Sequence, residues 1–493
     1  PTIDTSTEQD VAGGGYNHWA TAGFFGRLNY NYKEKYLLEV NGRYDGTSRF
    51  MKDQRWNFFP SFSLGWNVAR ENFWKPLESV VNQFKLRGSW GELGNQNTSN
   101  LYPFYEILPV KSNSGNWLVN GGKTNTADIP SLVSTLLTWE RVRSFNVGFD
   151  FGAFSNRLTG SFDYFVRKTV DMVGPAPQLP LVLGIAPAIV NNADMKSYGF
   201  EIELSWRDRI GEVDYGVKFN LADAQQKVVK YPNTTNAFSD WYAGKMSGEI
   251  WGYTSLGIAK TDEEMKEHLA SLPNGGQNQL GNKWGAGDIM YADINGDGKV
   301  DGGKGTLADP GDQRIIGNST PRYNFGLVLD ASYKGFDVSI FFQGVGKRDY
   351  APIVGTNGAV FWGAVNNIWQ SMAMEEHFDY FRPEGHPMGA NLNGYYPRPD
   401  FTSNKNHQVQ TRYLQDASYI RLKNLQIGYT LPKQWINKLH INRCRVYVSG
   451  DNLWTGTSLA SMFDPETLAA GDWGSGKTYP LSKVISFGLN VNF

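Results

Sequence analysis

Residues 485–493 read ISFGLNVNF, a run in which apolar residues alternate with small or polar ones without interruption. One set is Ile485, Phe487, Leu489, Val491 and Phe493, and the other is Ser486, Gly488, Asn490 and Asn492. Because successive side chains of a β-strand point to opposite faces, a period of two places each set on its own face. The stretch therefore predicts a strand with one apolar face and one polar face.

The same alternation recurs along the chain and predicts about 13 strands. The other segments that show it are 24–32, 38–44, 62–68, 84–90, 145–151, 158–164, 200–206, 215–221, 325–333, 336–342, 420–431 and 443–453. In the segment 420–431 the phase slips by one residue near Lys423 and Asn424, which predicts a β-bulge. The predicted fold class is all-β.

Composition narrows the possible environments of these strands. The formal net charge is only -1, which argues against nucleic acid as a partner, because phosphates select a basic surface. The mean hydropathy is -0.43, and the chain has no apolar run of about 18 residues, so a transmembrane helix is excluded. Transmembrane strands show only every second side chain to lipid, so this composition is compatible with a membrane barrel.

The connections between the predicted strands alternate in length. The short ones lie at 33–35, 152–156, 207–214 and 334–335, and the longest at 94–137, 170–194, 229–318, 352–415 and 455–480. Short periplasmic turns with long extracellular loops are typical of outer-membrane barrels. Aromatic residues beside the short turns indicate an interfacial girdle, with simple hairpin packing as the alternative. The prediction is a transmembrane antiparallel β-barrel with its apolar face toward lipid and its polar face toward the lumen.

An odd number of strands has a consequence for such a barrel. Bacterial barrels close with an even number, so we expect the chain to be the C-terminal part of a larger barrel. The missing edge strands, and whatever fills the lumen, would then belong to another polypeptide or to a part of the gene product outside residues 1–493.

Several longer segments resemble one family of transporters. They include RLNYNYKEKYLLEVNGRYDGTSRF (27–50), FPSFSLGWNVARENFW (59–74), KLRGSWGELGNQN (85–97), GDIMYADINGDGKVD (287–301), DASYIRLKNLQIGYTLP (416–432) and RVYVSGDNLWTGTSLASMFDPE (445–466). These segments are similar to the SusC/RagA family of TonB-dependent outer-membrane transporters of Bacteroidetes, and the similarity extends over nearly all of residues 1–493.

The resemblance implies a plugged barrel of about 22 strands in the outer membrane. It also implies a SusD-like surface lipoprotein as a lid, energy supplied through TonB by the missing N-terminal part, and an oligosaccharide or oligopeptide as the imported substrate. The terminal residues Phe487, Gly488, Leu489, Val491 and Phe493 would serve as the assembly signal read by the outer-membrane insertion machinery.

One loop has the spacing of a metal site. In DINGDGKVD (293–301) the candidate ligands are Asp293, Asn295, Asp297, the Lys299 carbonyl and Asp301. Oxygen ligands at alternate positions with Gly298 at the sixth suit Ca²⁺. Position twelve is Lys304 and not a carboxylate. Against the pattern of the family that the chain resembles, residues 302–311 read as an insertion before Asp312, so the resemblance implies Asp312, or else Asp309, as the closing carboxylate. The alternative is an ion-free turn stabilised by Asp and Asn side chains.

Aromatic residues in the long loops are candidates for substrate contact. Flat rings stack on sugar faces, and we single out Trp241, Trp251, Trp284, Trp362 and Trp369. Packing within the loops, or against the lid protein, is the alternative for each.

The sequence does not indicate an enzyme or an organic cofactor. The six histidines are scattered, without HExxH or GxSxG motifs, and no glycine loop for phosphate is present. Two alternatives to the importer stay open: an outer-membrane barrel enzyme, and a surface β-protein that binds calcium and glycan. Dependence on detergent would separate the importer from the surface protein.

Overall fold

A computed structural model describes residues 16–98, 100–174, 180, 182, 184–185, 188–352, 360–363, 373–400, 403–436, 441–468 and 478–493. Its main element is one 13-stranded antiparallel sheet in which the strands are ordered as in the sequence. The strands are β1 (Thr21–Tyr32), β2 (Tyr36–Thr47), β3 (Trp56–Asn67), β4 (Val81–Asn95), β9 (Glu140–Ala153), β10 (Leu158–Gly174), β11 (Val190–Ile210), β12 (Val213–Lys230), β17 (Arg322–Tyr333), β18 (Phe336–Lys347), β21 (Tyr419–Thr430), β22 (Arg443–Thr457) and β23 (Val484–Asn492). The predicted all-β class and the number of strands are confirmed.

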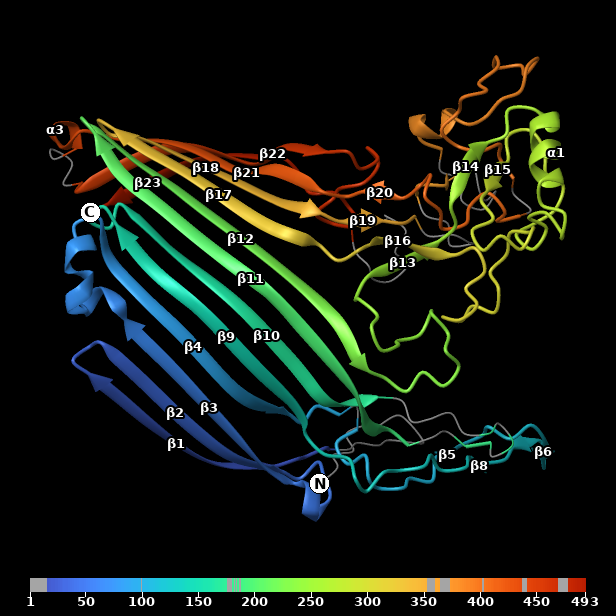
Figure 1. The fold of residues 1–493 in the computed structure, drawn as a ribbon, viewed down its shortest axis with the longest axis horizontal. Coiled ribbons are helices and arrows are strands. Elements are labelled where there is room, and N and C mark those ends of the chain that lie inside the picture. Colours follow the sequence, from blue (N-terminus) through green and yellow to red (C-terminus); the bar gives the residue numbers. More distant parts are fainter. Residues whose placement is uncertain are drawn as a thin grey trace.

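Figure 1 shows the sheet as a curved wall, with the short turns at one end and the long loops at the other. The strands β1 and β23 form its two edges. Several strands are longer than the alternation alone predicts: β11 extends over Val190–Ile210, beyond the predicted 200–206. Residues 190–199 extend the strand toward the long loops, whereas residues 207–210 extend it toward a turn that is shorter than the predicted 207–214.

The pairing register keeps the two faces of the sheet distinct. Between β1 and β2, Tyr30 pairs with Leu38 while Asn29 pairs with Glu39. The apolar face of the sheet is exposed to solvent, and Phe487 on this face is 86% exposed. A large exposed apolar face is unusual for a soluble monomer and is the expected surface of a barrel in lipid. Among the residues that the structure describes, no helix is both long and apolar enough to cross a membrane.

The predicted bulge in β21 is confirmed. Leu422 and Asn424 pair with consecutive positions of β18, so Lys423 is the extra residue. The register against β22 shifts at the same point. A one-residue slip in the sequence pattern thus corresponds to one unpaired residue in the ladder.

The aromatic residues at the turn between β1 and β2 form a stacked group beside Glu71. Tyr36 stacks between Tyr32 and Trp66, with ring centroids 6.5 and 6.4 Å apart. The Glu71 carboxylate accepts hydrogen bonds from Lys35 Nζ at 2.9 Å and from the Tyr36 hydroxyl at 2.7 Å. These two donors lower the pKa of Glu71 to about 2. The contacts tie the turn after β1 to the connection that follows β3.

Small elements fill the connections. The paired strands are β5 (Val110–Lys111) with β8 (Thr126–Ala127), β6 (Leu118–Val119) with β7 (Gly122–Lys123), β13 (Glu249–Gly252) with β16 (Arg314–Asn318), β14 (Ser255–Ile258) with β15 (Ile289–Tyr291), and β19 (Asp349–Tyr350) with β20 (Gln415–Asp416). Among the described residues, the α-helices are α1 (Asp262–Ala270) and α3 (Lys433–Ile436), and 3-10 turns cover Lys52–Gln54, Val68–Arg70, Asn72–Leu77 and Glu375–Phe378. Thr261 caps α1 by accepting a hydrogen bond from the Glu264 N–H at 3.1 Å.

The loops after β12, β18 and β22 share one buried core, which we call the loop domain. Its fully or nearly buried residues include Tyr253, Ile289, Tyr291, Phe361, Trp362, Tyr396, Tyr413 and Phe463. Segments far apart in sequence meet there, because irregular loops bury their aromatic residues only by packing on one another. In Figure 1 this assembly lies at the end of the sheet opposite the short turns.

Candidate functional site

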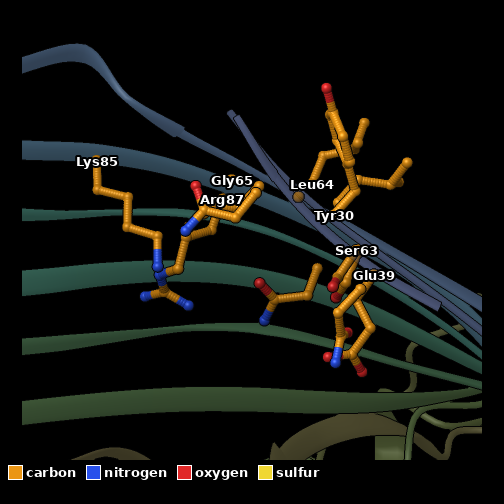
Figure 2. Close-up of a pocket in the computed structure, with 14 residues that line it drawn as sticks. Tyr30, Glu39, Ser63, Leu64, Gly65, Lys85 and Arg87 are labelled. Atoms are coloured by element: carbon orange, nitrogen blue, oxygen red, sulfur yellow. The ribbon is translucent and has the colours of Figure 1, made fainter. Parts of the chain in front are cut away.

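The polar face of the sheet forms a continuous wall, which we call the polar wall. Figure 2 shows how alternation creates it: Tyr30 and Leu64 project to one side of the strands, while Glu39 and Ser63 project to the other. A hollow over β1–β4 and β9 is lined on the polar side by Asn29, Glu39, Ser63, Lys85, Arg87 and Asn146. These are hydrogen-bonding groups and charges, as expected for a surface that faces water.

Arg87 links three strands of the polar wall. Its Nη2 lies 2.9 Å from Asp150 Oδ1 and 2.8 Å from Asp163 Oδ2, while its Nη1 lies 3.0 Å from Asp163 Oδ1. Asp163 is on β10, two strands away, and the residue between them on β9 is Gly148. A Cβ on Gly148 would lie 2.6 Å from Asp163 Oδ1. The absence of a side chain at Gly148 therefore leaves room for the Asp163 carboxylate to meet the guanidinium over β9.

The same arrangement recurs near the other edge of the sheet. Arg445 on β22 crosses Gly428 on β21 and donates from Nε to Asp337 Oδ1 on β18 at 2.9 Å. A Cβ on Gly428 would lie 2.6 Å from Arg445 Cζ. An arginine that spans a glycine to reach an acidic residue two strands away is thus a repeated feature of the polar wall.

One loop folds back onto the polar wall through ion pairs. Arg421 of β21 is nearly buried, and it lies 2.6 Å from Asp464 and 2.7 Å from Glu466. Lys423, the bulged residue, reaches the second oxygen of Glu466 at 2.6 Å. The bulge therefore aims an additional cation at the loop after β22 and helps to hold that loop against the wall.

The loop domain has a polar centre as well as an aromatic core. Asp288, fully buried, lies 3.0 Å from Lys405 Nζ and 2.7 Å from Arg398 Nη2, and it accepts from Asn406 Nδ2 at 2.9 Å. Because a buried carboxylate is costly without partners, these three donors fix the relative position of two loop segments more than 100 residues apart.

His407 lies beside this centre without a hydrogen bond in the described part of the chain. Neither ring nitrogen has a partner, and the ring packs edge-on against Trp362 with centroids 4.6 Å apart. Burial lowers the pKa of His407 to about 4. The imidazole is therefore neutral at physiological pH and acts as a packing group.

The predicted substrate-contacting tryptophans fall into different environments. Trp241 is 42% exposed, next to Tyr231. Trp251 stacks on Phe238 at 4.6 Å, and Trp284 packs against the loop-domain core beneath Lys405. Trp362 is 1% exposed inside that core, so the packing alternative describes it. Trp369 lies outside the described residues. Of this set, Trp241 has the most accessible ring among the described ones.

The carboxylate of Asp312 joins two parts of the loop that has the predicted calcium spacing. Asp312 Oδ1 accepts from the Ile294 N–H at 2.7 Å, and its Oδ2 accepts from the Asp301 N–H at 2.8 Å. Asp293 accepts from Gly296 and Gly298 at 2.6 and 2.8 Å. The remaining candidates also take part: Asn295 Oδ1 accepts from the Asp297 N–H, and Lys299 Nζ lies 2.5 Å from Asp301.

These contacts form a network of Asp and Asn turns around the loop. Within the described residues, no three His, Cys, Asp or Glu side chains are grouped so that they could hold a metal ion. Oxygen atoms from Asp293, Asn295, Asp297, Asp301 and Asp312 still suit a hard cation by their chemistry. Occupation by Ca²⁺ stays a prediction.

The terminal strand presents the residues of the predicted assembly signal on its two faces. Phe487, Leu489 and Phe493 are exposed on the apolar face, and Val491 belongs to the same set. Gly488 pairs with Tyr447 of β22, and a Cβ there would collide with the Tyr447 ring. The glycine thus seats an aromatic side chain of the neighbouring strand.

Sequence reasoning alone missed the glycine-spanning ion pairs and the polar centre at Asp288. The ion pairs left a signal in the sequence, because Gly148 and Gly428 each stand at a position of their strand where the alternation places a polar residue. The second left no signal, since Asp288 and Asn406 are not related by any period.

Comparison with known proteins then assigns the chain to a family. Residues 3–453 match the family model described as TonB dependent receptor-like, beta-barrel. The chain belongs to this family. Its members are receptors of the outer membrane and not enzymes, in agreement with the predicted location and class.

Individual members of the TonB-dependent receptor family align over nearly the whole chain. TonB-dependent receptor P3 of Formosa agariphila is 30% identical, over 95% of this chain and 45% of the relative. TonB-dependent receptor SusC of Bacteroides thetaiotaomicron is 24% identical, over 95% of this chain and 43% of the relative. The chain thus spans about half the length of the curated relatives it matches, and the SusC/RagA-like resemblance is confirmed.

A solved structure supports the barrel fold. The RagAB peptide transporter superposes with a TM-score of 0.75 at 22% identity, covering 99% of this chain and 49% of that chain. The 13-stranded sheet therefore corresponds to part of a TonB-dependent receptor barrel.

Proposed function

We propose that this chain forms part of the barrel of an outer-membrane importer that takes up an oligosaccharide or oligopeptide. The observation that carries the proposal is the polar wall, a face of hydrogen-bonding and charged groups in which several charges are paired within the protein, as Arg87 is with Asp150 and Asp163. Such a water-compatible wall lets a polar oligomer pass along the inside of the barrel. Family membership supplies the outer-membrane location.

The loop domain supports a role in substrate capture. It is a compact unit at the loop end of the wall, and Arg421 and Lys423 fix one of its segments to the wall. In this proposal a SusD-like lipoprotein covers the loops, and TonB supplies the energy through the plug of the complete protein. RagAB, whose fold the chain shares, is a peptide transporter, and this likeness favours a two-protein complex as the working form.

The test is purification of the complete protein from its own outer membrane through an affinity tag. We expect a lipoprotein to co-purify, together with bound oligomers whose masses shift after peptidase or glycosidase treatment. A preparation without a partner and without oligomers, from cells that grow on such oligomers, would contradict the proposal.

A pair of variants tests where the substrate binds. Trp241→Ala removes an exposed ring of the loop side, and Trp435→Ala removes an exposed ring at the short-turn side, in α3. We expect the first variant alone to lower the amount of co-purified oligomer. Equal retention by both variants would exclude Trp241 from substrate binding.

A further inference from the structure

Four adjacent strands place a cation at the same level of the apolar face. Arg143 on β9 pairs with Lys168 on β10, Lys168 pairs with Lys196 on β11, and Lys196 pairs with Lys227 on β12. Directly paired residues of an antiparallel sheet share a face, so the four side chains form one row. We call Arg143, Lys168, Lys196 and Lys227 the basic row.

Within the protein, only the residue at one end of this row forms an ion pair with an acidic residue. Arg143 Nε lies 2.7 Å from Glu92 on β4, whereas none of the ion pairs in the described part of the chain involves Lys168, Lys196 or Lys227. Like charges placed directly opposite one another in a sheet are destabilising. Three consecutive lysines in register therefore indicate an anion supplied from outside the protein.

Other cations of the same region differ from the basic row. Arg141, two residues before Arg143, lies 2.7 Å from Asp171, and Arg322 forms an ion pair with Asp223. The Asp194 carboxylate, two residues before Lys196, accepts from the Asp171 N–H at 3.0 Å. The fold thus provides acidic partners to these two arginines and leaves the lysines of the basic row exposed or half-exposed.

The position of the basic row relative to the apolar band identifies the environment. On β10 the apolar side chains continue through Phe162, Tyr164 and Val166, and Lys168 is the next residue on that face. On β11 the sequence of side chains is Phe200, Tyr198 and then Lys196, whose Nζ lies 5.0 Å from the centre of the Tyr198 ring. The row therefore borders the apolar band on the side of the long loops, at the level of lipid headgroups in the outer leaflet.

We propose that the basic row binds the phosphate groups of a phosphorylated glycolipid in the outer leaflet. Its acyl chains would lie on the apolar band below, and its phosphates would neutralise the lysines. Strands are about 4.8 Å apart, so the row is about 14 Å long, which suits a headgroup that carries more than one phosphate. The proposal rests on the outer-membrane location and not on the identity of the imported oligomer.

The experiment compares two triple variants of the complete protein in neutral detergent. The first is Lys168→Gln, Lys196→Gln and Lys227→Gln. The control is Lys85→Gln, Arg167→Gln and Lys218→Gln, which removes the same charge from the polar wall. Binding of bisphosphorylated lipid A, of the same lipid A after phosphatase treatment, and of phosphatidylglycerol is measured by native mass spectrometry.

We expect the intact protein and the control to bind bisphosphorylated lipid A better than the phosphatase-treated form. Each lysine near an anionic surface contributes roughly fivefold, so the row variant should lose on the order of a hundredfold in affinity. Without anionic lipid the row variant should be at least as heat-stable as the control, because repulsion within the row is gone. That measurement also reports whether the variant has folded.

Three results would overturn the proposal. They are equal binding of the two lipid A forms, equal loss in both triple variants, and binding of phosphatidylglycerol as tight as that of lipid A. The last result would mean that the row binds anionic lipids in general and does not select a glycolipid.

Discussion

The guanidinium of Arg87 reaches the carboxylate of Asp163 across an intervening strand, at 2.8 and 3.0 Å. Such a contact spans about twice the usual spacing between strands, or about 10 Å. It is possible because the intervening residue on β9 is Gly148, which has no side chain to occupy the space beside the Asp163 carboxylate. The pair ties β4, β9 and β10 into one unit on the polar wall.

Replacing Gly148 by alanine should break this unit. The new methyl group would lie 2.4 Å from the Phe162 carbonyl oxygen and 2.6 Å from Asp163 Oδ1, so β10 must shift and the carboxylate must move away from Arg87. We expect a loss of about 2 kcal/mol in the free energy of unfolding, as for other disrupted ion-pair networks. Urea unfolding of the complete protein in lipid vesicles measures it.

Gly88→Ala is the matched control, because Gly88 adjoins Arg87 and a Cβ there meets nothing within 4 Å. We expect its stability to be unchanged or slightly higher, since alanine suits a strand better than glycine. An equal loss in both variants would mean that the ion pair is not the cause.

The sequence pattern predicts the structural features that repeat with a fixed period and few of the others. The strands and the bulge at Lys423 were readable because alternation is a local property. Asp312 as the closing carboxylate came from the family resemblance and not from a period, and its part in calcium binding stays a prediction. The basic row could not be read from the sequence. Arg143 and Lys227 are found to lie at the same level of the sheet only when the three strand pairings between them are known. Packing in the loop domain, as at Trp362, follows no period at all.

Acid should loosen the loop domain through His407. The pKa of His407 is about 4 in the folded protein, below its ordinary value of about 6.5, so the unfolded chain binds the proton more tightly. The stability contributed by the neutral ring is present above pH 6.5 and is lost as the pH falls toward 4, by roughly 3 kcal/mol in total. His407→Phe should keep the domain protected at low pH, measured by hydrogen exchange of residues 403–418.

The control for this variant is His18→Phe, since the His18 side chain is exposed. It should leave the pH dependence of exchange in the loop domain as in the unaltered protein. Unchanged acid sensitivity in His407→Phe would assign the effect to another group.

The terminal strand should be sensitive at two positions for different reasons. Gly488→Val would drive a side chain into the Tyr447 ring, and Tyr447→Ser should restore assembly of that variant. Phe493→Ala removes an exposed aromatic group without touching the wall, so we expect fewer assembled barrels but normal uptake per barrel. Heat-modifiable migration of outer-membrane fractions on gels measures assembly. Barrel levels equal to those of the unaltered protein in Phe493→Ala would contradict the assembly role.

Calcium should stabilise the loop at residues 293–312, if the ion replaces Lys299 beside Asp301. Burial and the neighbouring Asp293 raise the pKa of Asp312, so a cation between these carboxylates would be favourable. We expect Ca²⁺, and not Mg²⁺, to slow proteolysis of this loop, because the smaller ion prefers rigid octahedral sites. Asp297→Asn should abolish the protection, whereas Glu263→Gln on α1 should not. Protection that is identical with Ca²⁺ and with a chelator would mean that the Asp and Asn turns hold the loop by themselves, as their hydrogen bonds allow.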